Sequence, residues 1–196
     1  MKSVILLIDG GHLRVSARDA GHFMDPDFIE GLSRRITASD EELKKVLYYD
    51  CAPYQGRQRQ PVSGEEKEFS ADGSWLDDLA CRDLFAVRRG QLKFRGWSPK
   101  KIPVAGTELS DSHFKPNFEQ KGVDMRLGLD IAEISEERLA DRILLVSADT
   151  DMIPAMKKAR RSGIQVVLFQ LPAKNSSGIL RTELKANADY VRQVTF

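Results

Sequence analysis

The sequence contains only two cysteines, has no long hydrophobic run and carries almost no net charge. Cys51 and Cys81 fit no metal-ligand spacing, and because no secretory segment is recognisable we expect no disulfide between them. The N-terminal apolar run, residues 4–8, is too short for the core of a signal peptide or for a membrane span. A formal net charge of +1 neither requires nor excludes a polyanionic partner. These absences predict a cytoplasmic protein that does not enter a membrane.

Glycine-rich phosphate-binding signatures are also missing. Gly10 and Gly11 follow the first apolar run, but they complete neither a Gly-x-Gly-x-x-Gly nor a Walker pattern. We interpret the pair as a sharp turn after a strand. His12 and Arg14 come directly afterwards and are candidates for contact with a substrate, although a polar residue in the first turn of a helix explains His12 equally well.

The composition is that of a folded globular protein, with 41% hydrophobic and 30% charged residues. A chain of 196 residues can form one domain with a full core, so we expect residues 1–196 to fold as a single unit. Two stretches, residues 53–73 and 98–118, are polar or lack periodicity, and we expect them to be long loops within that domain.

Short apolar runs alternate with helical patterns along the rest of the chain. Such runs, bounded by polar residues, are typical of strands buried on both faces, and they are found at residues 4–8, 46–49, 143–146 and 165–169. Strands and helices joined by short links form parallel sheets that are covered on both sides. The predicted fold class is therefore α/β, with a mostly parallel central sheet and helices on both faces.

Aspartates stand at the ends of two predicted strands and at the start of a predicted helix. Asp9 follows the first apolar run, and Asp149 and Asp151 follow the third. Asp124 opens a helix, where the helix dipole favours a carboxylate. The carboxyl ends of parallel strands meet at one edge of the sheet, so these four side chains should converge there. Because carboxylates that close repel one another unless cations bind, we predict a site for Mg²⁺ or Mn²⁺.

Two points about these aspartates stay open at this stage. The stretch of residues 147–154 has a plainer interpretation, in which its aspartates are solvated capping residues of a strand-to-helix turn. Asp130 lies six residues after Asp124 and projects from another side of the same helix. We expect Asp130 to support the site from behind or to pack at its margin.

The stretch of residues 88–101 has six basic residues and no acidic one. Phe94 and Trp97 are interleaved with this charge, and basic side chains combined with aromatic faces are the pattern of surfaces that bind single-stranded nucleic acid. We predict that Lys93 and Arg95 contact the nucleic-acid backbone and that Trp97 stacks on a base. The alternative is a solvated edge strand protected from aggregation by its charges.

Three blocks of the sequence resemble the NYN domain family, in particular its LabA-like branch. They are Leu-Ile-Asp-Gly-Gly-His-Leu at residues 7–13, Gln-Lys-Gly-Val-Asp-Met-Arg-Leu-Gly-Leu-Asp at residues 120–130 and Leu-Val-Ser-Ala-Asp-Thr-Asp-Met-Ile-Pro at residues 145–154. The resemblance implies a PIN-like fold and a metal-dependent ribonuclease.

The same resemblance assigns roles to individual residues. It places Asp9, Asp124, Asp149 and Asp151 in the acidic metal site. It places Ser147 at a small polar position that supports the site, and Lys121 at the basic position ahead of the second block. His12 departs from the family, because many relatives carry asparagine shortly after the first aspartate.

The first hypothesis is therefore an endoribonuclease that hydrolyses single-stranded RNA with Mg²⁺ or Mn²⁺. The second is an RNA-binding regulatory protein with a vestigial or weakly active metal site, for which the modest net charge and the long polar loop leave room. A phosphatase is a poor third, because its Asp-x-Asp motif follows the first strand and the motif here is Asp149 to Asp151. RNA is the expected partner, while single-stranded DNA and a homodimer remain open, since no group that reads a 2′-hydroxyl is identifiable.

Overall fold

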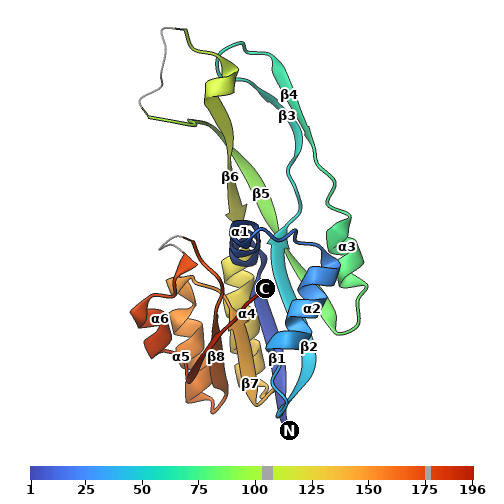
Figure 1. The fold of residues 1–196 in the computed structure, drawn as a ribbon, viewed down its shortest axis with the longest axis vertical. Helices are drawn as coiled ribbons and strands as arrows, with labels where there is room; N and C mark the ends of the chain where they lie inside the picture. Colours follow the sequence, from blue (N-terminus) through green and yellow to red (C-terminus); the bar gives the residue numbers. More distant parts are fainter. Residues whose placement is uncertain (103–107, 175–177) are drawn as a thin grey trace.

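The computed structural model describes residues 1–102, 108–174 and 178–196 and is drawn in Figure 1. Its body is a seven-stranded sheet with the strand order β6-β5-β2-β1-β7-β8-β9. Neighbouring strands run parallel except for β5 and β6, which are antiparallel. The strands are β1 (Lys2–Asp9), β2 (Glu41–Cys51), β5 (Phe85–Pro99), β6 (Phe114–Lys121), β7 (Arg142–Val146), β8 (Gln165–Gln170) and β9 (Tyr190–Gln193). The predicted α/β fold with a mostly parallel central sheet is therefore confirmed.

Helices cover both faces of this sheet. They are α1 (Gly10–Ala20), α2 (Pro26–Ile36), α3 (Trp75–Ala80), α4 (Val123–Glu136), α5 (Ile153–Arg161) and α6 (Thr182–Ala186). The first three pack their apolar residues into the core on one face, and the last three pack into the core on the other. Within the described part of the chain, every helix is too short or too polar to span a bilayer.

The central strand β1 shows why both faces must be covered. Val4, Leu6 and Ile8 pack into the core beneath α1, α2 and α3, whereas Ile5 and Leu7 pack into the core beneath α4, α5 and α6. Fully burying one such side chain contributes about 1.5–3 kcal/mol to folding. A strand that is apolar on both faces is stable only inside the sheet, and β1 lies between β2 and β7.

Two helix starts follow their sequence signals closely. The Asp25 carboxylate accepts a hydrogen bond of 2.8 Å from the backbone N–H of Phe28, and Pro26 occupies the first helical position of α2. Pro154 likewise lies in the first turn of α5. This second proline ends the turn that follows β7, so α5 begins directly behind the predicted acidic residues.

Both expected loops contain strands instead. Residues 53–73 include an antiparallel pair, β3 (Gln55–Arg59) and β4 (Glu66–Ser70). In the stretch of residues 98–118, β5 continues to Pro99 and β6 starts at Phe114, while residues 103–107 lie outside the described residues. The strands of the first pair are mostly exposed on both faces, so their sequence shows no apolar alternation from which a strand could be predicted.

These strands form an arm, which we define as residues 54–70 together with the described part of residues 91–121. Figure 1 shows the arm rising from the sheet, with β3 and β4 on one side and β5 and β6 on the other. The two ribbons meet through five aromatic rings whose neighbouring centroids are 5.4–6.3 Å apart: Tyr54, Phe69, Phe94, Trp97 and Phe118. Such contacts hold together two ribbons that would each be marginal alone.

Candidate active site

The first predicted ligand, Asp9, sits at the junction of β1 and α1. Its carboxylate caps α1 by accepting a hydrogen bond of 3.1 Å from the backbone N–H of His12. Gly10 follows, and a Cβ atom there would lie 2.5 Å from the hydroxyl of Tyr48 and 2.7 Å from a carboxylate oxygen of Asp50. Gly10 has no positive φ, so glycine is required here for close approach to β2 and not for the sharp turn that the sequence suggested.

Asp149 and Asp151 lie in the turn after β7, which begins the short 3₁₀ helix η2 (Thr150–Met152). The Asp149 carboxylate accepts a hydrogen bond of 2.9 Å from the Asp151 backbone N–H. The backbone N–H of Asp149 in turn donates to the hydroxyl of Ser147 at 3.2 Å, and Ser147 is buried. Ser147 therefore fixes the turn that presents Asp149, while Asp151 is exposed on the outer side of that turn.

Asp124 approaches the same place from the first turn of α4, as predicted. Gly122 precedes this helix with φ of +78°, a left-handed conformation that glycine adopts without strain. Although Asp124 is exposed by surface area, neighbouring protein atoms desolvate its carboxyl and raise its pKa, and the charges of Asp149, Asp9 and Asp151 raise it further. Asp9, Asp149 and Asp151 thus lie close enough to Asp124 for their charges to act on it.

The pKa of Asp9 is also raised. Burial is the main cause, and the charges of Asp50 and Asp149 add to it, whereas hydrogen bonds from the backbone N–H groups of His12 and Gly11 act in the opposite direction. Across the described ranges, no lysine or arginine forms an ion pair with Asp9, Asp124, Asp149 or Asp151. No ion pair among the described residues therefore neutralises these four carboxylates, although the charge of Arg14 reaches Asp9.

These donors are of the chemical type that a hard divalent cation binds, but they do not surround a position for the ion. All the donors are carboxylate oxygens, the ligands that Mg²⁺ takes, usually together with several waters. Among the residues that the structure describes, no three histidine, cysteine or acidic side chains are close enough to hold an ion directly. An ion at this edge would accordingly keep water ligands, or the exposed Asp124 and Asp151 would move towards it.

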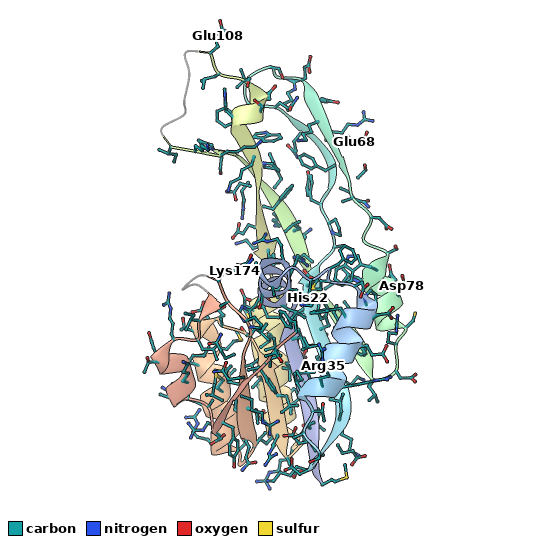
Figure 2. The ribbon with its side chains drawn as sticks, viewed as in Figure 1. His22, Arg35, Glu68, Asp78, Glu108 and Lys174 are labelled. Atoms are coloured by element: carbon teal, nitrogen blue, oxygen red, sulfur yellow. The ribbon has the colours of Figure 1, made fainter. Side chains whose placement is uncertain are left out.

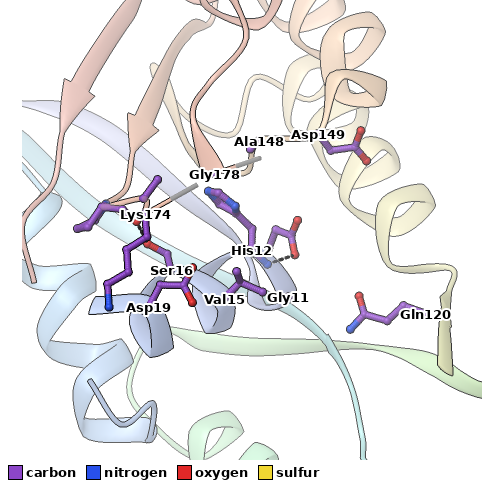
Figure 3. Close-up of a pocket in the computed structure, with 13 residues that line it drawn as sticks. Gly11, His12, Val15, Ser16, Asp19, Gln120, Ala148, Asp149, Lys174 and Gly178 are labelled. Atoms are coloured by element: carbon purple, nitrogen blue, oxygen red, sulfur yellow. Dashed lines mark hydrogen bonds between the residues drawn. The ribbon is translucent and has the colours of Figure 1, made fainter. Parts of the chain in front are cut away.

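A pocket of about 410 Å³ adjoins the carboxylates (Figure 3). Its lining includes Asp9 and Asp149 at one side, then His12, Ser16 and Gln120, with Lys174 from the segment after β8. Figure 3 shows the His12 ring lining this space from α1. Burial lowers the pKa of His12, so the ring is neutral at physiological pH.

Asp50 is a residue of this region that sequence reasoning left aside. Its carboxylate is completely buried at the end of β2, and Arg14 on α1 forms an ion pair with it. The Tyr48 hydroxyl donates to Asp50 at 3.2 Å and the Gln120 amide donates at 3.4 Å. With its oxygens engaged in this way, Asp50 holds α1, β2 and β6 together beneath Asp9. Its place directly after an apolar run was the signal available in the sequence.

Three predicted residues have partners that change their expected roles. Arg14 binds Asp50, so it braces the site instead of standing free for a substrate. Lys121 pairs with Glu119 on β6 and makes no ion pair with the carboxylate cluster within the described residues. Asp130 accepts hydrogen bonds of 2.7 Å from the Tyr49 hydroxyl and 3.0 Å from Arg88, on the side of α4 that faces β2 and β5. Asp130 therefore packs at the margin of the site, which was one of its two expected positions.

The basic stretch of residues 88–101 is β5 and its end, and most of its arginines are already paired. Arg88 bonds to Asp130, Arg89 to Asp77 and Arg95 to Glu119. The alternative of a charged edge strand is wrong, because β6 covers β5 and forms the edge itself. The charges alternate with apolar residues along β5 because one face of the ribbon packs on the aromatic cluster and the other is exposed.

Trp97 does not present a free face for stacking. Its ring belongs to the aromatic cluster of the arm, against Phe69 and Phe94, and the Lys67 ammonium lies 5.6 Å from the ring centroid. Its indole N–H donates to the backbone carbonyl of Arg59 at 2.8 Å. Trp97 therefore joins the two ribbons of the arm, and the prediction that it stacks on a base is corrected to this structural role.

The comparisons with known proteins bear on the family and on the fold. The sequence model of the NYN domain family matches residues 77–193, which is 117 of the 196 residues. That range contains Asp124, Asp149 and Asp151, while Asp9 precedes it. Among solved structures, a protein of unknown function from Vibrio parahaemolyticus is similar over 99% of this chain and 93% of its own, with a TM-score of 0.51 and 16% identity. At that identity the likeness shows the fold alone, and no curated protein matches the chain.

Proposed function

The chain belongs to the NYN domain family of PIN-like nucleases, and on that premise we propose that it is a metal-dependent endoribonuclease of the LabA-like branch. The observation that carries the proposal is that the charges of Asp149, Asp9 and Asp151 all act on the Asp124 carboxyl, and that none of the four forms an ion pair within the described chain. Carboxylates with a perturbed pKa and no counter-ion are expected at functional sites. Phosphodiester hydrolysis with Mg²⁺ or Mn²⁺ is the chemistry that such a donor set supports best.

Each side chain has a separate task in this proposal. A bound Mg²⁺ or Mn²⁺ would neutralise the carboxylates together with the phosphate and lower the pKa of an attacking water. Asp9 and Asp149, which are held in place by backbone hydrogen bonds, would be the fixed ligands. Asp124 and Asp151 are more exposed and would complete the site, and their oxygens would accept hydrogen bonds from the water and orient it.

The arm offers the surface along which single-stranded RNA would run. Gln120 lies at the base of β6 beside Asp50 and Gly11, so the arm begins next to the carboxylates. The outward face of the β5–β6 ribbon carries Lys93, Arg95 and Lys121 around the single acid Glu119. A ribbon with excess positive charge beside an acidic site would hold the phosphate backbone while the scissile phosphate approaches the cation.

A second candidate is an RNA-binding regulatory protein with a weakly active site. One observation favours it, which is that the described carboxylates form no group close enough to hold an ion directly. This candidate predicts RNA binding that is the same in chelator and in Mn²⁺, with no product formed. It differs from the nuclease in turnover and not in affinity, so one assay separates the two.

The test uses a circular single-stranded RNA, which has no ends, and a DNA circle of the same sequence. We expect the protein to open the RNA circle in Mn²⁺ or Mg²⁺ and to leave it intact in EDTA. Cleavage of linear RNA alone would indicate an exonuclease, and equal cleavage of both circles would remove the restriction to RNA. Binding without cleavage in either metal would establish the regulatory protein and overturn the proposed enzyme.

A further inference from the structure

The pocket beside the carboxylates has a graded lining that the cleavage of a phosphodiester does not by itself require. Asp9 and Asp149 lie at its acidic end, while His12 and Ser16 follow one another along α1. These last two are four positions apart, so they lie on the same face of the helix, about one turn apart. The volume of about 410 Å³ lies within the range of small-molecule sites, and it can hold one nucleoside but not several.

The walls of this pocket are fixed by contacts on both sides. The Ser16 hydroxyl donates to the backbone carbonyl of Pro172, which ties the segment after β8 to α1. On the other side, a Cβ atom at Gly11 would lie 3.2 Å from the Gln120 amide oxygen and 3.3 Å from a carboxylate oxygen of Asp9. The pocket is therefore continuous with the predicted cation site, and it is bounded by three elements that are distant in sequence.

His12 supplies the observation that points to a ligand. Its Nε2 atom is buried and, among the described residues, is the one buried side-chain nitrogen or oxygen without a hydrogen-bond partner. A buried polar atom in that condition costs free energy unless a ligand or a water supplies its partner. The ring lines the pocket (Figure 3), and because Nε2 itself is not exposed to solvent, the ring must turn for an occupant of the pocket to supply that partner.

Lys174 places a positive charge at the rim of the pocket. It forms no ion pair with the described residues, so its ammonium group is available to an anion. Asp19 lines the pocket at the same end as Lys174 (Figure 3), so that end carries both signs of charge. The order along the pocket is thus carboxylates that would hold the cation on the scissile phosphate, a neutral polar stretch with an unpaired ring nitrogen, and a lysine beside an aspartate. A nucleoside fits the first two parts of this order, and Lys174 is the group that would meet the next phosphate.

We infer that this pocket is a nucleoside subsite, in which His12 Nε2 forms a hydrogen bond with the sugar or the base of the nucleotide next to the cleaved bond. The inference rests on the proposed function for the identity of the substrate, although the pocket can be tested without cleavage. His12 is then a residue that binds and positions the substrate, and Lys174 binds the flanking phosphate.

The first experiment titrates the ¹⁵N-labelled protein with adenosine and with uridine in EDTA. These nucleosides carry no phosphate, so the carboxylates do not repel them and no cleavage interferes. We expect chemical shift changes at the His12 ring and along α1. The variant His12→Phe, which has no ring nitrogen, should bind at least about tenfold more weakly, as expected for one lost hydrogen bond. His12→Gln retains a hydrogen-bonding group and should bind within about threefold of the wild type.

A matched control and a kinetic measurement complete the test. Lys185→Ala alters an exposed residue of α6 outside the pocket lining and should change neither binding nor cleavage. With single-stranded RNA in Mn²⁺, His12→Phe should raise KM about tenfold and leave kcat nearly unchanged. Wild-type KM in a folded His12→Phe protein, or shift changes that map away from α1, would overturn the subsite while leaving the nuclease intact. If the wild type cleaves nothing, the proposed function fails, and the titration in EDTA still decides the subsite.

Discussion

The two ends of the central sheet both hold carboxylates that are at least partly buried, but the ends differ in how these are neutralised. At the carboxyl end Arg14 neutralises Asp50, whereas Asp9 has no ion-pair partner among the described residues, and we call this the uncompensated end. At the amino end of β2, Glu41 accepts hydrogen bonds of 2.9 Å from Arg142 and of 2.7 and 2.9 Å from Arg192. Burial alone would raise the pKa of Glu41, yet the bonds from Arg192, the Ala38 N–H and Arg142 lower it from 4.5 to about 2. At the carboxyl end the pKa of Asp9 is raised, chiefly by its burial.

This difference separates carboxylates that stabilise the fold from carboxylates that serve a site. Glu41 joins β2 to β7 and β9 through its two arginines, so its charge contributes to folding. Asp9 and Asp124 at the other end lack such partners among the described residues, and burial together with nearby carboxylates raises the pKa of both, so their charges oppose folding at neutral pH. A cluster that costs stability in the free protein is explained if it binds a cation.

The largest expected effect is at the uncompensated end. Asp149→Asn should reduce Mn²⁺-dependent cleavage of single-stranded RNA by about 10³-fold, because it removes one charge from the cation site. The fold should persist, since an asparagine oxygen can still accept the hydrogen bond from the Asp151 N–H. The measurement is kcat/KM with labelled RNA, together with the melting temperature in EDTA.

Asp78→Asn is the matched control for this variant. Asp78 is an exposed aspartate on α3, away from the carboxylate cluster (Figure 2). The Asp78→Asn protein should cleave single-stranded RNA with the kcat/KM of the wild type. Wild-type turnover by Asp149→Asn would remove Asp149 from the site, and a large loss of stability in EDTA would show that its charge serves the fold.

The second effect is at the compensated end. Glu41→Gln should destabilise the protein by about 3 kcal/mol near neutral pH, because it leaves buried Arg142 with the exposed Asp40 as its one charged partner among the described residues and removes the charged partner of Arg192. The folded pKa of Glu41, about 2, lies below its unfolded value of 4.5. Its contribution is therefore complete above about pH 4.5 and is lost as the pH falls towards 2. Urea unfolding at pH 7 and at pH 3 measures this difference.

The neighbouring residue supplies the control for this pH dependence. Glu42 is exposed by about half and pairs with Lys44 on the same strand. Glu42→Gln should change the free energy of unfolding by less than about 1 kcal/mol at either pH. If both variants lose equal stability, the burial of Glu41 is not what distinguishes the two ends of the sheet.

The parts of the fold that could be predicted from sequence are those with a local signal. β1 and β7 are apolar on both faces, so their central position and the edge at which Asp9 and Asp149 meet followed from pattern alone. The arm could not be predicted, because β3 and β4 are exposed and are stabilised by aromatic rings that come from separate stretches.

The same reasoning explains which site residues were missed. Asp50 follows an apolar run as Asp9 does, but its role depends on Arg14 and Gln120, which approach from α1 and β6. An ion pair across two strands also decided the outcome for Arg95, which binds Glu119 on β6, whereas Lys121 binds the same glutamate from two residues away on its own strand. Sequence shows where a charge stands along an element, whereas its partner is set by the packing of elements onto one another.

The third effect concerns the arm, which stands beside the uncompensated end. Replacing Lys93 and Arg95 together by alanine should weaken binding of single-stranded RNA by about threefold to tenfold in EDTA, whatever the sequence. The slope of log affinity against log salt should fall by about one and not two, because Glu119 already neutralises part of Arg95. Filter binding at several salt concentrations checks both values.

A variant of Lys185 is the control for the double variant of Lys93 and Arg95. Lys185→Ala changes an exposed residue of α6 and should leave both affinity and slope unchanged. An unaltered slope in the double variant would exclude the outer face of the β5–β6 ribbon from the RNA path.

Trp97→Ala should instead lower the stability of the arm, since its ring packs on Phe69 and Phe94.

The smallest effect tests the cost of the uncompensated carboxylates directly. Because the folded pKa of Asp124 is raised above its unfolded value of 3.8, its ionisation opposes folding as the pH rises through that interval. Asp124→Asn should therefore stabilise the metal-free protein at pH 7, by no more than about 1 kcal/mol because solvent screens this exposed group. The gain should vanish below about pH 3.8, where the wild type is protonated too.

Mn²⁺ should make the wild type the more stable of the two proteins, since its free energy of unfolding rises by RT ln(1 + [Mn²⁺]/Kd) and that of the variant rises by less. Melting curves in EDTA and in Mn²⁺ measure this, with Glu133→Gln on the same helix as the control. A destabilised Asp124→Asn in EDTA would place Asp124 with Glu41, among the carboxylates that serve the fold.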